Sequence, residues 1–90
     1  METDRETVLK FPCEFPIKVM GRSGNGLRDQ VIEIVDRHSA QRLSSRAVTS
    51  RTSRRGNYVS VTAVVSATSQ RQLDDIYREL TACDVVMIAL

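Results

Sequence analysis

Ninety residues, 41% of them hydrophobic, make one small domain and exclude an extended disordered chain. Thirteen basic and eleven acidic residues give a net charge of +2, which is too mild to indicate a nucleic-acid partner by itself. Two cysteines are too few for a disulfide framework, and no apolar run approaches the roughly 18 residues of a membrane span. We therefore expect a cytoplasmic protein with reduced cysteines, no membrane contact and no cofactor.

The N-terminal residues 1–10 are polar and of mixed charge, and they lack the apolar stretch of a signal peptide. We expect them to be a disordered tail ahead of a single domain over residues 11–90. The first strand is predicted from Phe15 to Met20, where the odd-numbered residues are apolar. Pro16 fits only near the start of that strand, where its missing N–H costs least.

A loop that is rich in glycine precedes residues 27–38, whose apolar residues recur at helical spacing and predict an amphipathic helix ending at His38. The longest strand pattern runs from Tyr58 to Ala67, with alternate apolar residues directed toward a core. Gly56-Asn57 before it predicts a two-residue hairpin turn, because glycine tolerates a positive φ. Its partner strand is the weaker segment Leu43–Arg55, whose Ser, Thr and Arg content is typical of a sheet edge.

Ser69 predicts the N-cap of a second helix. The buried stripe of that helix is expected to be Leu73, Ile76, Tyr77 and Leu80. A last strand is predicted over Val85–Leu90. Because both of its faces are apolar, its orientation is assigned by parity: Val86, Ile88 and Leu90 inward, Val85 and Met87 outward.

The element order β-α-β-β-α-β predicts an α+β ferredoxin-like plait, a four-stranded antiparallel sheet with both helices on one face. The right-handed crossover rule places the first and third strands side by side in the centre. The second and fourth strands then become the edges.

Several motifs also resemble a known family: Phe11-Pro12, the run Phe15–Gly21, the run Gly56–Thr62, the helical run Ile76–Leu80 and the terminal run Val86–Leu90. On these the chain resembles the YbeD-like family of small bacterial proteins, over nearly all of residues 11–90. The resemblance implies a ferredoxin-like fold similar to ACT-type regulatory domains, and it implies no established activity. The chain departs from the family in its glycine-rich loop and in its more basic second strand.

The glycine-rich loop is the first candidate site. In ACT-like domains the loop at this place helps to bind small effectors, and free N–H groups at the following helix start can hold an anion. The candidate effector-binding residues are Gly21, Arg22, Gly24, Asn25 and Gly26. The alternative is a plain connection, since the spacing is not that of a dinucleotide-binding fingerprint.

The second candidate site is basic. Five arginines occur in one stretch that contains no acidic residue: Arg42, Arg46, Arg51, Arg54 and Arg55. They indicate either a phosphate-binding strand or a solvated edge that discourages aggregation. Tyr58 is the single aromatic residue at an outward position of the central strands, so base stacking of the kind used by RNA-recognition plaits is poorly supported. Nucleic-acid binding is therefore the alternative hypothesis.

The third candidate site is the sheet face that the helices leave open. Its partner-binding residues are expected to be Lys18, Met20, Tyr58, Thr62, Val64 and Met87. A protein partner or a second copy of the chain would cover this face, and the alternative is a scatter of surface aliphatic side chains.

No catalytic constellation is apparent. One histidine and two cysteines cannot close a four-ligand metal site, and His38 fits the last turn of the first helix. Cys13 and Cys83 are expected at opposite ends of the sheet as free thiols. Arg22 and Asn57 superficially match the Arg and Asn of acylphosphatases, but the loop motif of those enzymes is absent. The favoured function is a non-catalytic module that binds a partner protein or a small effector.

Overall fold

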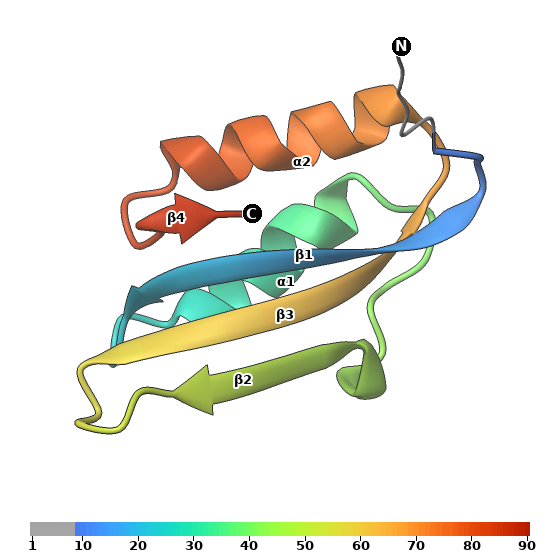
Figure 1. Ribbon diagram of the computed structural model, residues 1–90. Helices are drawn as coiled ribbons and strands as arrows, with labels where there is room; N and C mark the ends of the chain where they lie inside the picture. Colours follow the sequence, from blue (N-terminus) through green and yellow to red (C-terminus); the bar gives the residue numbers. More distant parts are fainter. Residues whose placement is uncertain (1–8) are drawn as a thin grey trace, which may run out of the picture.

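Two long antiparallel strands, β1 (Cys13–Arg22) and β3 (Tyr58–Ala67), form the centre of the sheet (Figure 1). The structure is a computed structural model, and it describes residues 9–90. β2 (Val48–Thr52) pairs with β3, and β4 (Ile88–Ala89) pairs with β1, so the strand order is β2-β3-β1-β4. The predicted ferredoxin-like plait, with its first and third strands in the centre, is confirmed.

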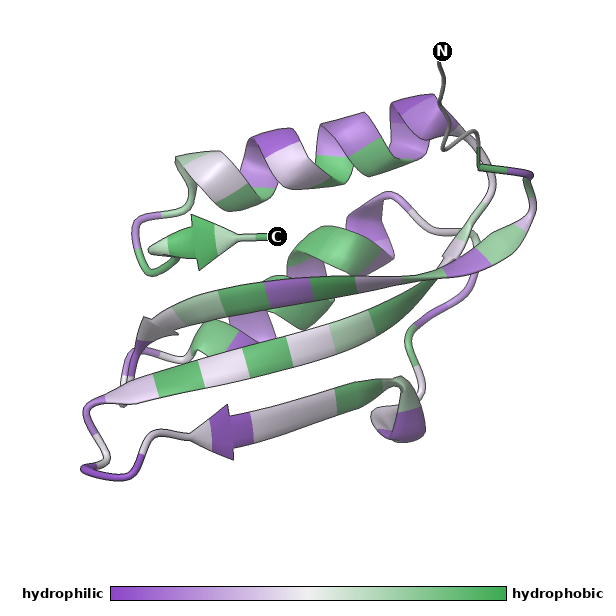
Figure 2. Ribbon diagram, viewed as in Figure 1, coloured by the Kyte–Doolittle hydropathy of each residue, from purple (hydrophilic) through white to green (hydrophobic). Residues whose placement is uncertain are grey.

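The helices α1 (Leu27–Arg37) and α2 (Gln70–Ala82) cover one face of this sheet because each presents one apolar stripe. Alternate residues of β1 and β3 point toward these stripes, and Figure 2 shows the matching bands of hydropathy along β3. The fully or nearly fully buried core consists of Ile17, Val19, Leu27, Val31, Ile34, Val35, Val48, Val61, Ala63, Val65, Ala67, Leu73, Ile76 and Leu80. The predicted stripe of α2 is confirmed, with Tyr77 partly buried at its margin.

The start of α2 is capped as its sequence predicts. The Ser69 hydroxyl accepts a hydrogen bond from the N–H of Gln72 at 3.0 Å. The Gln72 side chain in turn accepts from the N–H of Thr68 at 2.7 Å. The first bond satisfies one of the backbone donors that a helix start leaves free, and the second ties the first turn to the residue before the cap.

The hairpin between β2 and β3 is longer than predicted. Gly56 has a φ of 79°, as expected, but the loop spans residues 53–57 and is not a two-residue turn. Its closure explains the difference: the N–H of Ser53 donates to the carbonyl of Tyr58 at 2.8 Å, and the Ser53 hydroxyl accepts from the N–H of Tyr58 at 3.1 Å. Inside that closure, the N–H of Gly56 donates back to the carbonyl of Ser53 at 2.9 Å.

The second strand is shorter than the predicted segment Leu43–Arg55. A 3-10 turn, η2 (Ser45–Ala47), occupies its first part, and pairing with β3 begins only at Val48. The N–H of Leu43 donates to the carboxylate of Asp36 on α1 at 2.9 Å, and the Leu43 side chain packs partly against the core. This bond to the helix layer keeps the chain out of the plane of the sheet until β2 begins.

The predicted last strand over residues 85–90 is reduced to Ile88–Ala89. Its predicted facing is wrong for Val85, Ile88 and Leu90, whereas Val86 packs partly against the core and Met87 is exposed, as predicted. The chain first turns after α2, where the N–H of Val86 donates to the carbonyl of Cys83 at 3.1 Å. Val85 and Val86 therefore pack partly against the core as turn residues. Ile88 then pairs with Met20 on the outer face, and Ile88 and Leu90 are 48% and 70% exposed.

Pro16 lies fourth in the ten-residue β1. The N–H and C=O of Lys18 bond to Leu90, so even-numbered backbone groups of β1 point to the side of β4. β4 does not extend as far as Pro16, and the missing N–H of this proline therefore breaks no sheet hydrogen bond.

The expected tail, residues 1–10, lies mainly outside the described residues, although Leu9 packs partly against the core. Within residues 9–90 neither helix is both long and apolar enough to cross a membrane.

Candidate functional site

The loop between β1 and α1 holds part of the predicted effector site. Gly24 and Gly26 have φ angles of 86° and 71°, and Gly26 precedes α1 without a side-chain cap. The N–H of Ser23 donates to the carbonyl of Asn57 at 2.9 Å, which ties this loop to the β2–β3 hairpin. Asp29 in the first turn of α1 already supplies the negative charge that a helix start favours, so a bound anion would meet a like charge there. Effector binding by this loop stays a prediction.

Two residues of the predicted effector site, Gly21 and Arg22, lie at the end of β1. A Cβ atom added to Gly21 would overlap the carbonyl oxygen of Val85 and lie 3.2 Å from Cδ2 of Leu27. Glycine is therefore required here by close backbone approach. Arg22 points to the outer face of the sheet, where its guanidinium lies 5.6 Å from the centre of the Tyr58 ring.

Most of the predicted partner-binding residues lie on the outer face of β1 and β3. These are Lys18, Met20, Tyr58, Thr62 and Val64. Met87 lies beside them, since its N–H donates to the carbonyl of Met20 at 2.8 Å. Their role in binding stays a prediction.

The large exposed hydrophobic residues of the described chain gather at one end of the sheet. They form what we call the apolar patch: Met20, Tyr58, Met87, Ile88 and Leu90. Met20 is the link within it, because it pairs with Ser60 on one side and with Ile88 on the other. Ile88 and Leu90 were missed by the sequence analysis, since a short, uniformly apolar strand has no alternation that reveals its outer side.

Three cations accompany the apolar patch on the outer face. Lys18 and Arg22 lie on β1, and Arg51 lies on β2 opposite Ser60. Among residues 9–90 no acidic side chain forms an ion pair with any of them. Glu14, the acidic residue of β1, lies at the other end of that strand. This end of the face is therefore both apolar and basic.

The predicted basic edge is not one strand of arginines. Arg46 lies in η2, Arg51 lies in β2, and Arg54 and Arg55 lie in the hairpin loop. The turn and the loop end the strand early, so the structure does not place these guanidinium groups in a single row.

Charge is divided between the two layers of the fold. α1 and α2 together carry six acidic and four basic residues, whereas the rest of the chain from residue 9 onward carries two acidic and eight basic residues. The sheet, its loops and its edges are therefore basic, and the helix layer is mildly acidic.

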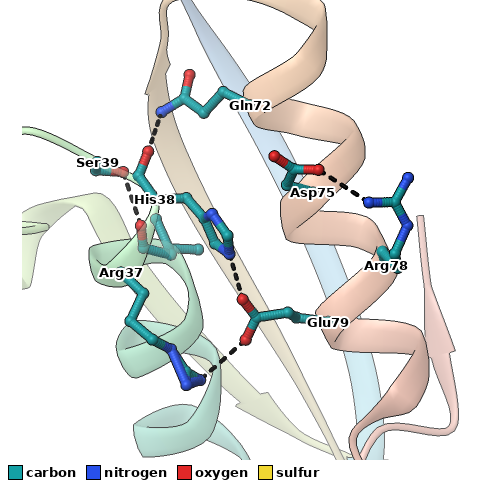
Figure 3. Close-up of polar contacts among 8 residues, drawn as sticks. Arg37, His38, Ser39, Gln72, Asp75, Arg78 and Glu79 are labelled. Atoms are coloured by element: carbon teal, nitrogen blue, oxygen red, sulfur yellow. Dashed lines mark hydrogen bonds and ion pairs between the residues drawn. The ribbon is translucent and has the colours of Figure 1, made fainter.

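A polar cluster joins the two helices on the helix layer (Figure 3). The imidazole of His38, at the C-cap of α1, pairs with Glu79 of α2. Arg37 pairs with the other carboxylate oxygen of Glu79 at 3.1 Å, and the Gln72 side chain donates to the carbonyl of His38 at 3.0 Å. The cluster fixes the end of α1 against α2, and no sequence signal connects residues so far apart in the chain.

This cluster contains an imidazole–carboxylate pair but lacks an aligned nucleophile. The hydroxyl of Ser39, next to His38, donates to the carbonyl of Val35 at 2.8 Å. Cys13 and Cys83 are both free, as predicted. Within residues 9–90 no group of three or more His, Cys, Asp or Glu side chains could hold a metal ion.

The fold and its surfaces define a class: a small α+β plait with a helix-covered face and an open sheet face that is apolar and basic at one end. Residues 6–90 match the family described as "Protein of unknown function (DUF493)". The chain belongs to this family, which confirms the resemblance to YbeD-like proteins.

Its relatives are bacterial proteins that carry the name UPF0250 protein. The chain is 41% identical to that of Paraburkholderia phytofirmans over 90 residues, which is all of both chains. It is 38% identical to that of Shewanella sediminis over 96% of this chain and 94% of the relative. It is 43% identical to that of Ectopseudomonas mendocina over 91% of this chain and 89% of the relative.

Proposed function

We propose that this protein is a non-catalytic binding module that docks the apolar end of its open sheet face onto an acidic surface of a partner protein. The observation that carries the proposal is the apolar patch, which gathers the large exposed hydrophobic side chains beside cations that no described carboxylate neutralises. Exposed apolar groups rimmed by charge are typical of protein interfaces.

A protein partner fits this face better than a small effector does. The hollow beside the apolar patch is lined by Met20, Arg51 and Tyr58 among others, and its volume is ≈ 280 Å³. Ligand pockets usually enclose about 300–1,000 Å³ and bury most of the ligand. A shallow hollow on a sheet suits one protruding side chain of a protein.

Nucleic acid is the weaker alternative. The patch contains one aromatic ring, that of Tyr58, and the guanidinium of Arg22 lies over it. Recognition of single strands by plaits uses several stacking rings on the central strands. The remaining cations would support only weak contacts with phosphates, which high salt abolishes.

The test is site-specific photo-crosslinking in the native cell. We expect a photoreactive residue at Ile88 to yield an adduct of one discrete mass, whereas the same residue at Glu33 on α1 yields none. Lys18→Glu combined with Arg51→Glu should abolish the adduct, and Arg55→Glu in the hairpin loop should leave it intact. An adduct of twice the chain mass would identify a second copy as the occupant, and nuclease-sensitive adducts would identify nucleic acid. Equal labelling at both positions would contradict a docking role for this face.

A further inference from the structure

The opposite end of the sheet has an open strand edge. β3 is ten residues long but β2 is five, and their pairing ends at Val48 with Ala63. The next N–H in line, that of Ala47, donates to the carbonyl of Ser44 at 3.0 Å because the chain there forms the turn η2. Among described strands, the last four residues of β3 are paired with β1 alone.

The backbone groups at this edge can be assigned from the hairpin. The carbonyl of Tyr58 accepts from Ser53 on the side of β2, so even-numbered backbone groups of β3 point to that side. Val64 and Ser66 therefore direct their N–H and C=O groups toward the open edge. The register that pairs Val48 with Ala63 reaches no further than Val64, so Ser66 has no partner on this side among the described strands.

A hollow of ≈ 590 Å³ lies beside this edge. Val64 and Ser66 contribute to its lining together with Arg42, Arg46 and Glu14. No described acidic side chain forms an ion pair with either arginine. The hollow thus combines the backbone groups of Ser66, which no described strand pairs on this side, with two guanidinium groups and one carboxylate.

We propose that this hollow binds an extended peptide segment with acidic side chains, which adds to β3 as a short strand. An added strand satisfies the N–H and C=O groups of Ser66, as in other cases of strand addition to a sheet edge. Arg42 and Arg46 favour carboxylates in that segment, since they outnumber Glu14. The site is independent of the apolar patch, which lies at the other end of the sheet.

Replacing Ser66 with proline removes the backbone N–H that faces the open edge of β3. Because its N–H points away from β1, Ser66→Pro leaves the β1–β3 bonds intact, just as Pro16 does naturally on the other edge. The second variant combines Arg42→Gln with Arg46→Gln and leaves the backbone unchanged. Arg54→Gln combined with Arg55→Gln, in the hairpin loop, is the matched control for loss of two positive charges.

The experiment titrates the isotope-labelled protein with a capped peptide, Gly-Val-Glu-Val-Glu-Val-Gly, and follows amide resonances. The amide of Ser66 should shift and exchange more slowly with solvent, and the Gln-for-Glu peptide should bind at least tenfold more weakly. Each of the two test variants should weaken binding at least tenfold, and the Arg54→Gln, Arg55→Gln control should not. The proposal is overturned if the peptide does not bind, if the edge amides are unaffected, or if inorganic phosphate produces the same shifts, which would mark a simple anion site. If Ser66→Pro does not fold, the arginine variant and the edge amides still decide the question.

Discussion

Gly21 is the position at which one added carbon atom should cost most. The Cβ of Gly21→Ala would overlap the carbonyl oxygen of Val85. That carbonyl cannot move freely, because the N–H of Val86 donates to Cys83 at 3.1 Å and the N–H of Met87 donates to Met20 at 2.8 Å. Relief of the overlap therefore requires the segment that leads into β4 to leave its place.

The magnitude follows from three contributions. Overpacking costs about 1–3 kcal/mol, and each lost backbone hydrogen bond costs about 1 kcal/mol. Replacement of glycine by alanine in a strand returns about 0.5–1 kcal/mol. With the bonds of Met87 and Leu90 both lost, we expect a net loss of about 2–4.5 kcal/mol in the free energy of unfolding, and each kcal/mol lowers Tm by about 4–8 °C in a domain of this size.

The assay is urea unfolding combined with amide hydrogen exchange. In Gly21→Ala the amides of Met87 and Leu90 should lose protection, since both donate to β1. Gly24→Ala is the matched control: it is strained by its φ of 86°, but nothing lies within 4 Å of the added carbon. It should lower stability by about 1–2 kcal/mol and leave β4 protected. A Gly21→Ala protein with wild-type stability and full protection of these amides would refute the reasoning.

Three further changes test other parts of the fold. Gly56→Val should lower the free energy of unfolding by about 1–3 kcal/mol because its φ is 79°, whereas Gly56→Asn should cost far less; equal melting temperatures would argue against a strained turn. A double-mutant cycle with His38→Gln and Glu79→Gln should give a coupling of at most about 1 kcal/mol that weakens with salt, because the pair is partly exposed; a coupling that high salt leaves unchanged would contradict this. Burial raises the pKa of the Tyr77 phenol in the folded protein above its unfolded value. The contribution of this shift to the free energy of unfolding is complete below about pH 10 and is lost as the pH rises through the folded-state pKa. Unfolding measured above pH 10 should therefore depend more steeply on pH in the wild type than in Tyr77→Phe, and parallel curves would exclude the effect.

The elements with strong periodicity were predictable because local spacing alone decides which side is buried. β3 alternates over its whole length, and α1 and α2 each have one apolar stripe. The cap at Ser69 and the positive φ of Gly56 also depend on neighbours a few residues away. The strand order then follows from the handedness of the crossovers.

Residues 85–90 show where local pattern was insufficient. Their apolar side chains suit either face, and the choice was made by bonds from Met87 and Leu90 to β1. These bonds turned Ile88 and Leu90 outward and thereby completed the apolar patch. The hollow beside β3 could not be predicted from the sequence either. It depends on the bond from Leu43 to Asp36 and on the turn η2, which together stop β2 early.

The sequence by itself determined the two helices, the two central strands and most of the core, since each of these depends on a repeat that is readable along the chain, and the strand order followed from the handedness of the crossovers. Only the tertiary structure decided where the charges meet the exposed apolar side chains. Acidic and basic residues alternate irregularly in the sequence, but antiparallel pairing brings Lys18, Arg22 and Arg51 onto one face, while Glu79 pairs with Arg37 and His38 on the helix layer. The reason is physical: burial fixes which side of each element is apolar, whereas the positions of charges relative to one another depend on contacts between elements far apart in the chain.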